Sequence, residues 1–356
     1  MRQFQLAYSL KVLLWLFLFF GGLYFARLFI IPMVFAVLLA LLFMPFCVRL
    51  EKYMHSGLAA FICVLLFISF CIGISAILFW QVGNVFEDMQ GIQTQVQQLI
   101  SEAKTWIEEK FGLSQQKQDK IIENSSSNGS EGSEVISAIT GILFGFLVDF
   151  ILVVVYTFIF LSTRTKFYNF ILQQRLPSEH AETKIIINNI QKVSQQYISG
   201  LAIMIGCLWI MYGIGFTIIG VEHALLFAVL CGILELVPFV GNFTGNVITM
   251  LMGITQGGGI SLVIKIACTY VTVQFLQTYF LEPLVVGRKV KINAFATIAG
   301  LVLAELLWGV AGLILAIPLL GITKIVCSHI PGLQPYADLI GSDEKKKIKK
   351  KRLIKI

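Results

Sequence analysis

Long blocks of apolar residues constrain this chain more than any other feature. A helix of about 20 apolar residues crosses the hydrocarbon core of a bilayer, and apolar blocks occupy residues 12–31, 33–48, 58–80, 135–161, 197–221, 224–256, 260–281 and 294–327. Of the 356 residues 57% are hydrophobic and 13% charged, whereas a soluble domain has about 45–50% and about 25%. The sequence therefore predicts an all-α, polytopic integral membrane bundle with about eight hydrophobic segments.

Two of these blocks are interrupted near their middle. Pro238 and Gly241 break the block at 224–256 into arms that are short for a membrane crossing, and Gly309 and Gly312 break the block at 294–327, with Pro318 beyond them. Irregular backbone at membrane depth survives only where protein or a water-filled cavity covers it. We therefore expect two helical hairpins, either re-entrant or fully crossing.

We do not expect the first apolar block to be a cleaved signal peptide. It lacks a small-residue cleavage site, and Pro32 leads directly into the second block. We expect these two blocks to cross as an antiparallel pair, the second of them short and bent at Pro45.

Residues 83–134 differ from the rest of the chain because they are polar and acidic, with nine acidic and four basic side chains. Apolar residues recur here at alternating spacings of four and three, which predicts one amphipathic extramembrane helix over about 84–111. They are Val85, Met89, Ile92, Val96, Leu99, Ala103 and Trp106. The following stretch, 125–133, has the composition of a flexible linker.

The placement of Lys and Arg predicts the orientation. The N-terminus, the 49–55 turn, the 162–196 loop, the 288–291 turn and the tail are basic, so we place both termini in the cytoplasm and 83–134 outside. A helix that begins near 179 is expected to run into the next span. The organisation is then 1–82, N-terminal membrane segments; 83–134, extracytoplasmic helix and linker; 135–196, span and basic loop; 197–328, membrane core with both hairpins; and 329–356, tail.

Several kinds of site have no counterpart in the sequence. The seven cysteines form no C-x-x-C pair, the four histidines are scattered, and no hydrolase or phosphate-loop motif occurs. We expect neither an enzyme nor a metal or cofactor site, and no nucleic-acid partner. The basic run at 345–352 is assigned to anionic lipid at the membrane surface.

Three motifs in order resemble the AI-2E family of bacterial transporters, formerly grouped as PerM-like permeases. Residues 220–226 (GVEHALL) with 233–241 (ILELVPFVG) are similar to the family's G-x-x-x-A-L-L and N-x-I-P-Y-x-G patterns. Residues 281–290 (LEPLVVGRKV) resemble its P-L-x-x-G-R-x-x pattern, and 309–318 (GVAGLILAIP) its G-x-x-G-x-x-L-A-V-P pattern. The match covers about 196–328 well and 1–80 more loosely.

The chain departs from the family pattern at four places. Glu235 stands where Asn is common and Phe239 where Tyr is common. Asn293-Ala294 replaces a His-Pro pair, and Ser199 replaces an Arg. The resemblance implies a multi-pass protein of the bacterial plasma membrane that forms a homo-oligomer such as a pentamer. Family members are implicated in autoinducer-2 export or in Na⁺(Li⁺)/H⁺ antiport.

Glu235 is the sharpest site candidate. It lies three residues before Pro238 in a broken apolar hairpin, where transporters use freed helix ends to bind substrates or cations. A water-exposed carboxylate at a bend near the membrane surface is the alternative.

Other ionisable residues within apolar blocks are also candidates, since a charge at membrane depth normally faces protein or water. They are Glu305, Glu282, Asp149 and Lys265. The alternatives are a structural pairing of Glu305 with Lys265 or Arg27 and a helix-end ion pair for Glu282. Residues that allow bends and close helix approach form a structural set: Pro238, Gly241, Gly245, Pro283, Gly287, Arg288, Gly309, Gly312 and Pro318.

These observations favour transport of a small polar solute, autoinducer-2-like and coupled to protons or ions. Intramembrane acids keep cation/proton antiport open as an alternative. A non-transporting scaffold or sensor, in which the heptad helix and the tail bind partners, also remains open.

The heptad stripe predicts a protein interface, because an apolar stripe of this length is unfavourable in water. Replacing Ile92 and Leu99 with Asp should lower the melting temperature and weaken assembly, measured by size-exclusion chromatography of the purified protein. An unchanged oligomer and melting temperature would assign the stripe another role.

Overall fold

The computed structural model describes residues 2–87, 131–238, 240–285 and 292–342. Within these ranges the chain folds into helices, and the extended pairing that occurs there is an isolated bridge between Ile292 and Gly341. Among the described residues, six helical stretches are long and apolar enough to cross a membrane. The prediction of an all-α membrane bundle is confirmed.

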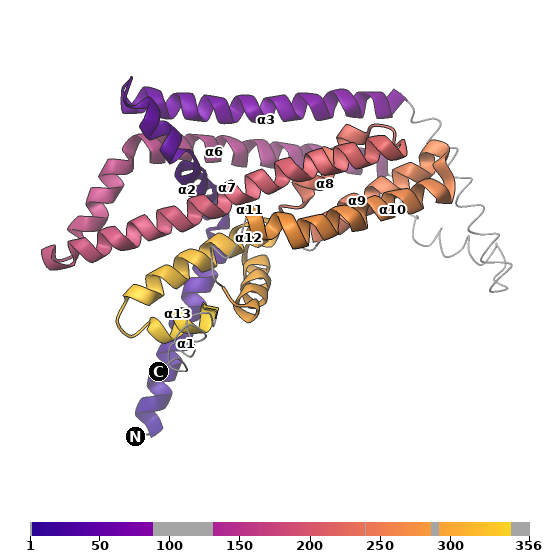
Figure 1. Ribbon diagram of the computed structural model, residues 1–356. Helices are drawn as coiled ribbons and strands as arrows, with labels where there is room; N and C mark the ends of the chain where they lie inside the picture. Colours follow the sequence, from indigo (N-terminus) through magenta and orange to yellow (C-terminus); the bar gives the residue numbers. More distant parts are fainter. Residues whose placement is uncertain (1, 88–130, 239, 286–291, 343–356) are drawn as a thin grey trace, which may run out of the picture.

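The N-terminal helices α1 (Arg2–Phe25) and α2 (Arg27–Leu50) do not form the expected antiparallel pair. Only Ala26 separates them, with φ −86° and ψ 9°, and its N–H still donates to the Gly22 carbonyl. A single residue this close to helical geometry bends the chain and cannot reverse it. Figure 1 accordingly shows α1 leaving the bundle at a steep angle. Pro32 and Pro45 both lie inside α2.

Three long helices run lengthwise through the bundle (Figure 1): α3 (Ser56–Glu87), α6 (Glu131–Gln173) and α7 (His180–Ile219). The expected 162–196 loop is mostly helical, because α6 continues to Gln173 and α7 begins at His180 after the short 3₁₀ turn η1 (Pro177–Glu179). The prediction that a helix beginning near 179 runs into the next span is confirmed.

Small side chains let α2, α3 and α6 approach closely. Their shared core is made of buried residues that are mostly alanine or cysteine: Ala40, Cys47, Ala59, Ala60, Cys63, Val64 and Leu161. Free cysteine packs as a small apolar side chain. A second core around α7 uses larger side chains, among them the fully buried Tyr212 and Phe216.

The first broken block is a hairpin of α8 (Ala224–Leu234) and α9 (Val240–Gly253). Its base is closed by the Gln256 side chain, which accepts from the Glu222 N–H (3.1 Å) and donates to the Glu222 carbonyl (3.4 Å). The 11 residues of α8 rise about 16 Å, about half the hydrocarbon thickness. This arm is therefore too short to cross the membrane, so the hairpin is re-entrant and its tip lies within the bundle.

The helix α10 (Gly259–Leu276) lies between two π-helical turns, η2 (Ile254–Gly258) and η3 (Gln277–Leu281). It packs on α7 where Thr269 faces Gly215; a Cβ on that glycine would come within 2.5 Å of the threonine methyl. The short α11 (Glu282–Val285) follows η3.

The second broken block is the hairpin α12 (Ala294–His329), whose tip is Gly309 with φ 60° and ψ −141°. The close approach of Gly300 to Leu320 shows that its arms fold back on each other. Asn293 caps the first arm by accepting from the Ala296 N–H (2.7 Å) and donates its side-chain amide to the Gly341 carbonyl (3.2 Å). The C-terminal helix α13 (Gln334–Ile340) is thereby held at the hairpin base.

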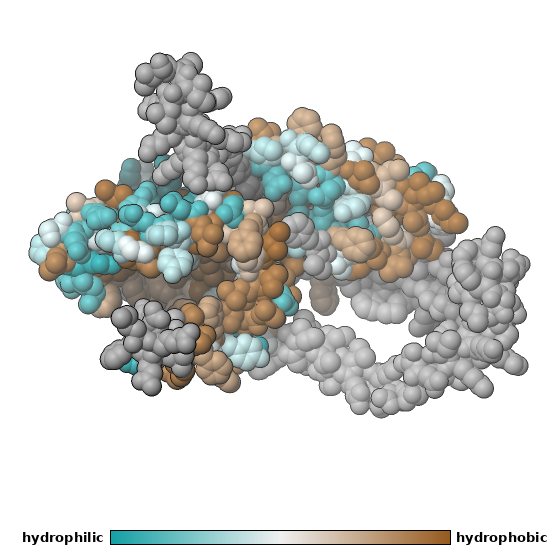
Figure 2. Space-filling model, turned by 90° about the horizontal axis from the view of Figure 1, so that it is seen from below, coloured by the Kyte–Doolittle hydropathy of each residue, from teal (hydrophilic) through white to brown (hydrophobic). Residues whose placement is uncertain are grey.

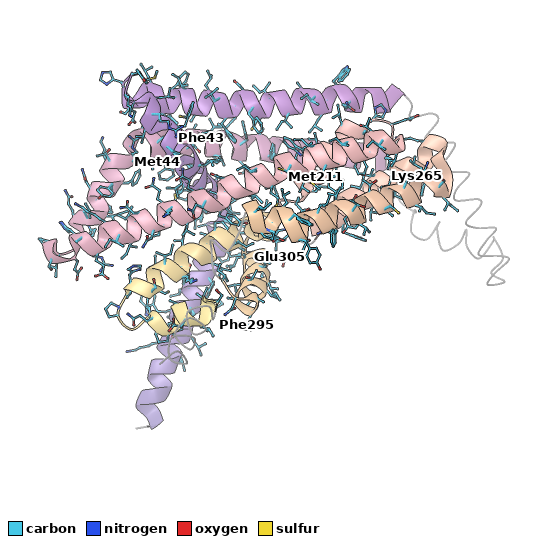
Figure 3. All side chains as sticks on the ribbon, viewed as in Figure 1. Phe43, Met44, Met211, Lys265, Phe295 and Glu305 are labelled. Atoms are coloured by element: carbon cyan, nitrogen blue, oxygen red, sulfur yellow. The ribbon has the colours of Figure 1, made fainter. Side chains whose placement is uncertain are left out.

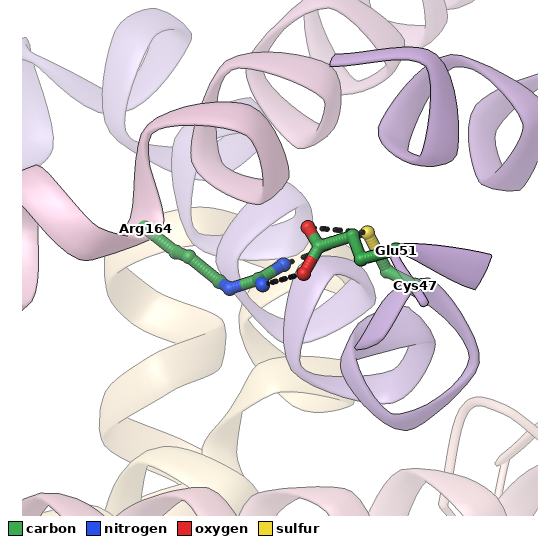
Figure 4. A network of polar contacts seen from close by, with 3 residues as sticks. All are labelled: Cys47, Glu51 and Arg164. Atoms are coloured by element: carbon green, nitrogen blue, oxygen red, sulfur yellow. Dashed lines mark hydrogen bonds and ion pairs between the residues drawn. The ribbon is translucent and has the colours of Figure 1, made fainter. Parts of the chain in front are cut away.

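A charged contact ties α6 to the turn after α2. Arg164 forms an ion pair with Glu51 and donates to the Cys47 sulfur at 3.6 Å (Figure 4). The basic 49–55 turn and the start of the basic 162–196 segment therefore lie at the same end of the bundle, as the charge-based orientation requires.

Several sequence predictions lie largely or wholly outside the described residues. The heptad helix is described only up to Glu87, where it continues α3, and the linker only from Glu131, which begins α6. The basic turn at 288–291, including Arg288, and most of the tail lie outside, as do Phe239 and Gly287.

Loss of the Arg164 side chain should destabilise the bundle, because the Glu51 carboxylate is only 18% exposed. We expect Arg164→Ala to cost roughly 1.5–3 kcal/mol, the range for a hydrogen bond to a charged group, measured as a lower melting temperature of the purified protein. The control is Arg175→Ala, which breaks an exposed pair with Glu179 (3.7 Å) worth about 0–1 kcal/mol. Equal shifts for both variants would contradict the assignment.

The first hairpin also depends on Gly241, where a Cβ would lie 1.6 Å from the Leu234 carbonyl oxygen. Gly241→Ala should lower the free energy of unfolding by about 1–3 kcal/mol through overpacking. The control Gly206→Ala adds its methyl group in open space within α7 and should leave the melting temperature unchanged or raise it. If both substitutions behave alike in thermal melting, the tight tip is not a stability determinant.

Candidate functional site

The tip of the first hairpin places the carboxylate of Glu235 inside the bundle. Glu235 follows the last residue of α8, and the chain turns through Pro238 before α9 begins. One carboxylate oxygen, Oε1, accepts from Gln277 Nε2 at 2.7 Å. The other, Oε2, is buried and has no partner. The Glu235 residue as a whole is partly exposed.

Gln277 is the residue that joins this tip to α10. It is only 5% exposed and begins the π-helical turn η3. A π turn inserts an extra residue into the helical repeat and occurs frequently at functional sites. The Gln277 Oε1 atom is also buried without a partner.

A separate polar network joins α7, α9 and α10. The Tyr212 hydroxyl donates to Asn242 Oδ1 (2.9 Å) and accepts from Asn246 Nδ2 (3.2 Å). Asn242 in turn donates its side-chain amide to Gln274, three residues before Gln277 on α10. Tyr212, Asn242 and Asn246 are all buried, so this network lies inside the apolar bundle.

The unpartnered atoms around the tip are of one chemical kind. Asn246 Oδ1 joins Glu235 Oε2 and Gln277 Oε1 as a buried oxygen without a hydrogen-bond partner. Buried acceptors of this kind are costly to leave unpaired. A proton, a cation or a solute that presents N–H or O–H groups would satisfy them, and an anion would not.

The other predicted site residues are not brought to this tip. Asp149, Lys265, Glu282 and Glu305 are exposed on the surfaces of their helices. Figure 3 places Lys265 and Glu305 in different parts of the bundle. No ion pair joins Glu305 to Lys265 or Arg27 within the part of the chain that the structure describes, and Arg27 instead lies 4.8 Å from the ring centroid of Tyr24.

The position of Lys265 along α10 explains why a lysine is tolerated in this apolar span. It lies one helical turn from Thr269, toward the end of α10 that adjoins the base of the first hairpin. Since Thr269 faces Gly215, Lys265 is about level with the end of α7. A lysine at such a level reaches the membrane surface with its ammonium group.

The structural set serves the hairpins in two ways. Gly241, Gly245 and Gly312 allow close approach: a Cβ at Gly245 would lie 3.0 Å from the Cys231 sulfur. Gly309 supplies the positive φ of the second tip, a conformation that glycine adopts readily. Pro318 lies within the second arm of α12, and Pro283 lies in α11.

Sequence reasoning missed Tyr212, Asn242, Asn246, Gln274 and Gln277. A usable signal was present, because the two asparagines are four residues apart on one arm and the two glutamines three apart in an apolar span. Amides at helical spacing within apolar helices pair across helix interfaces.

The surface matches a protein embedded in lipid. Figure 2 shows extensive apolar surface on the helices and a hydrophilic area at the left end, where Figure 1 places the α6–α7 turn. Within the described residues, no group of three or more His, Cys, Asp or Glu side chains is arranged to hold a metal ion.

Relatives of known sequence point to transport. The chain is 26% identical to the candidate transport protein YueF of Bacillus subtilis over 305 residues, 82% of each chain. It is 28% identical to the candidate transport protein YrrI of the same organism over 133 residues, but spans only 37% of that protein. It is 26% identical to the candidate transport protein YhhT of Escherichia coli over 136 residues, 38% of this chain and 39% of YhhT.

A family model agrees with these relatives. The model of the AI-2E family transporters matches residues 13–332, which includes both hairpins, the Glu235–Gln277 contact and the polar network. The motifs that suggested the family are therefore part of a match over most of the chain. This chain is a multi-pass membrane protein that belongs to the AI-2E family of transporters.

Proposed function

We propose that this protein moves a small polar solute, such as autoinducer-2, across the bacterial plasma membrane, with Glu235 as the group that exchanges protons during the cycle. The single observation that supports this most is the partly buried Glu235–Gln277 contact at the tip of a re-entrant hairpin. A carboxylate in these surroundings is costly when charged. The protonation state of Glu235 therefore depends on whether a solute or a cation is bound at the tip.

The orientation and assembly belong to the same proposal. The C-terminus lies in the cytoplasm, because basic segments flank it, and its basic tail contacts the lipid headgroups. The cytoplasmic position expected for the N-terminus required a reversal between α1 and α2, which the chain does not make at Ala26. Copies of the chain assemble into a homo-oligomer such as a pentamer. The chain is not an enzyme in this proposal and needs no cofactor or metal.

Cation/proton antiport is the second candidate, and one observation favours it. The unpartnered atoms near the tip are oxygens of a carboxylate and two amides, the ligand type that hard cations such as Na⁺ or Li⁺ take. A cation and a proton would then compete for Glu235, which is the minimum requirement for exchange. A non-transporting scaffold has no such support, since it does not require a buried polar tip.

Substitution of Glu235 tests the proposal. Glu235→Gln keeps the shape and removes the titration, so pH-dependent transport should be lost while the protein still folds; Glu235→Asp should keep part of the activity. The measurement is autoinducer-2 uptake into proteoliposomes over a pH series, with Na⁺- or Li⁺-driven proton flux as a parallel assay for antiport.

The matched control is Glu222→Gln, which removes an exposed carboxylate at the base of the same hairpin and should leave the pH profile unchanged. A Glu235→Gln protein that inserts normally and transports with the wild-type pH profile would show that Glu235 is not the coupling group.

A further inference from the structure

The two hairpins begin with the same sequence plan. Helix α8 begins at Ala224 and α12 begins at Ala294. Eleven residues after each alanine stands a glutamate followed by leucine, in ILELV (233–237) and in LAELL (303–307). Each glutamate therefore comes just before the tip of its hairpin.

The two tips are also built around the same close contact. A Cβ at Gly241 would lie 1.6 Å from the carbonyl oxygen of Leu234, the residue before Glu235. A Cβ at Gly312 would lie 1.9 Å from the carbonyl oxygen of Ala304, the residue before Glu305. In both hairpins the returning arm thus presses a glycine onto the peptide that precedes the glutamate.

The hairpins enter the bundle from opposite ends. The first opens and closes at Glu222 and Gln256, next to the start of α10. The second opens at Asn293, beyond the other end of α10, and closes near α13. The span Gly259–Leu284 has 26 residues, a rise of about 39 Å, so the two bases lie on different sides of a membrane. In Figure 1 they lie at the right and at the lower left.

Each hairpin also follows a long helix that runs toward the base of that hairpin. Helix α7 runs toward the base of the first hairpin, and α10 runs back toward the base of the second. A span followed by a hairpin is therefore repeated once with inverted orientation, although the second hairpin packs on α7 and the first hairpin packs on the span that precedes it. Repeats of this kind place equivalent groups on the two sides of a transport site.

We infer that α7–α9 and α10–α12 are inverted repeats, and that Glu305 is the counterpart of Glu235 at the hairpin that enters from the cytoplasmic side. Glu235 contacts Gln277, whereas Glu305 is exposed among apolar neighbours, among them Leu306 with 68% exposure. A carboxylate on an apolar surface at this depth needs water or protein beside it. Trp308 of the same tip donates to the Leu23 carbonyl of α1 (3.1 Å), but within the described residues Glu305 has neither a hydrogen-bond nor an ion-pair partner, so we place it beside water that enters from the cytoplasmic side. This role for Glu305 rests on the proposed transport function, but the inverted repeat does not.

Sidedness labelling tests the repeat without any transport. In the full-length chain, Glu222→Cys and Gln334→Cys place a thiol on an exposed residue at the base of each hairpin. A membrane-impermeant maleimide should label Glu222→Cys only from outside and Gln334→Cys only from the cytoplasmic side, above the background of the unmodified chain. Labelling of both positions from one side would overturn the inverted repeat.

Transport by Glu305 variants tests the role. Glu305→Gln removes the charge that we assign to the transport path and should lower autoinducer-2 uptake by about tenfold or more, equivalent to about 1.4 kcal/mol, and Glu305→Asp should recover part of it. Asp149→Asn, on the exposed surface of α6, is the control and should keep wild-type uptake. Wild-type uptake by Glu305→Gln would overturn the role of Glu305. A wild-type chain without uptake would overturn the proposed function and leave the labelling result standing.

Discussion

A helix that turns round inside an apolar bundle leaves polar groups without water, and each must find a partner or remain costly. In this protein the hydrogen bond from Gln277 to Glu235 meets that constraint in part at the tip of the first hairpin, because it pairs Oε1 of the carboxylate and leaves Oε2 without a partner. It fixes the tip against α10 and keeps a carboxylate among helices that are otherwise apolar. In the neighbouring polar network Asn242 is likewise paired, because its side chain bonds to both Tyr212 and Gln274.

This contact depends on close packing elsewhere in the hairpin. Gly241 allows the returning arm to touch the Leu234 carbonyl, and Gly245 allows it to pack against Cys231. Larger residues at these positions would push α9 away from α8 and remove the tip from reach of Gln277. The glycines therefore act on the site through the position of the arm, and the carboxylate and amides provide its chemistry.

The sequence predicted the parts of the fold that depend on strong, repeated signals. Apolar blocks predicted the spans, and Pro238 and Gly309 predicted the two breaks, since proline lacks the N–H that a helix interior needs and glycine readily adopts a positive φ. The reversal expected near Pro32 was wrong. The chain bends at Ala26, and the buried Pro32 is accommodated within α2, as membrane helices allow when neighbouring helices cover the freed backbone groups.

The site was only partly predictable for a related reason. Glu235 stood out because it is an acid beside a break. Gln277 did not, because its direction depends on the π turn that begins there, and a repeat of 3.6 residues does not predict such a turn. The pairing of Asn242 with Gln274 joins residues 32 positions apart and depends on how α9 packs on α10, which no local pattern specifies.

The central claim is that Glu235 and Gln277 act as one unit in transport, and a double-substitution cycle measures this directly. Autoinducer-2 uptake into proteoliposomes would be compared for Glu235→Gln, Gln277→Ala and the double variant. When two groups act as a unit, the fold-losses in uptake of the single variants do not multiply in the double variant. The double variant should therefore take up as much autoinducer-2 as the less active of the two single variants. Losses that multiply, or wild-type uptake by Gln277→Ala, would contradict the account.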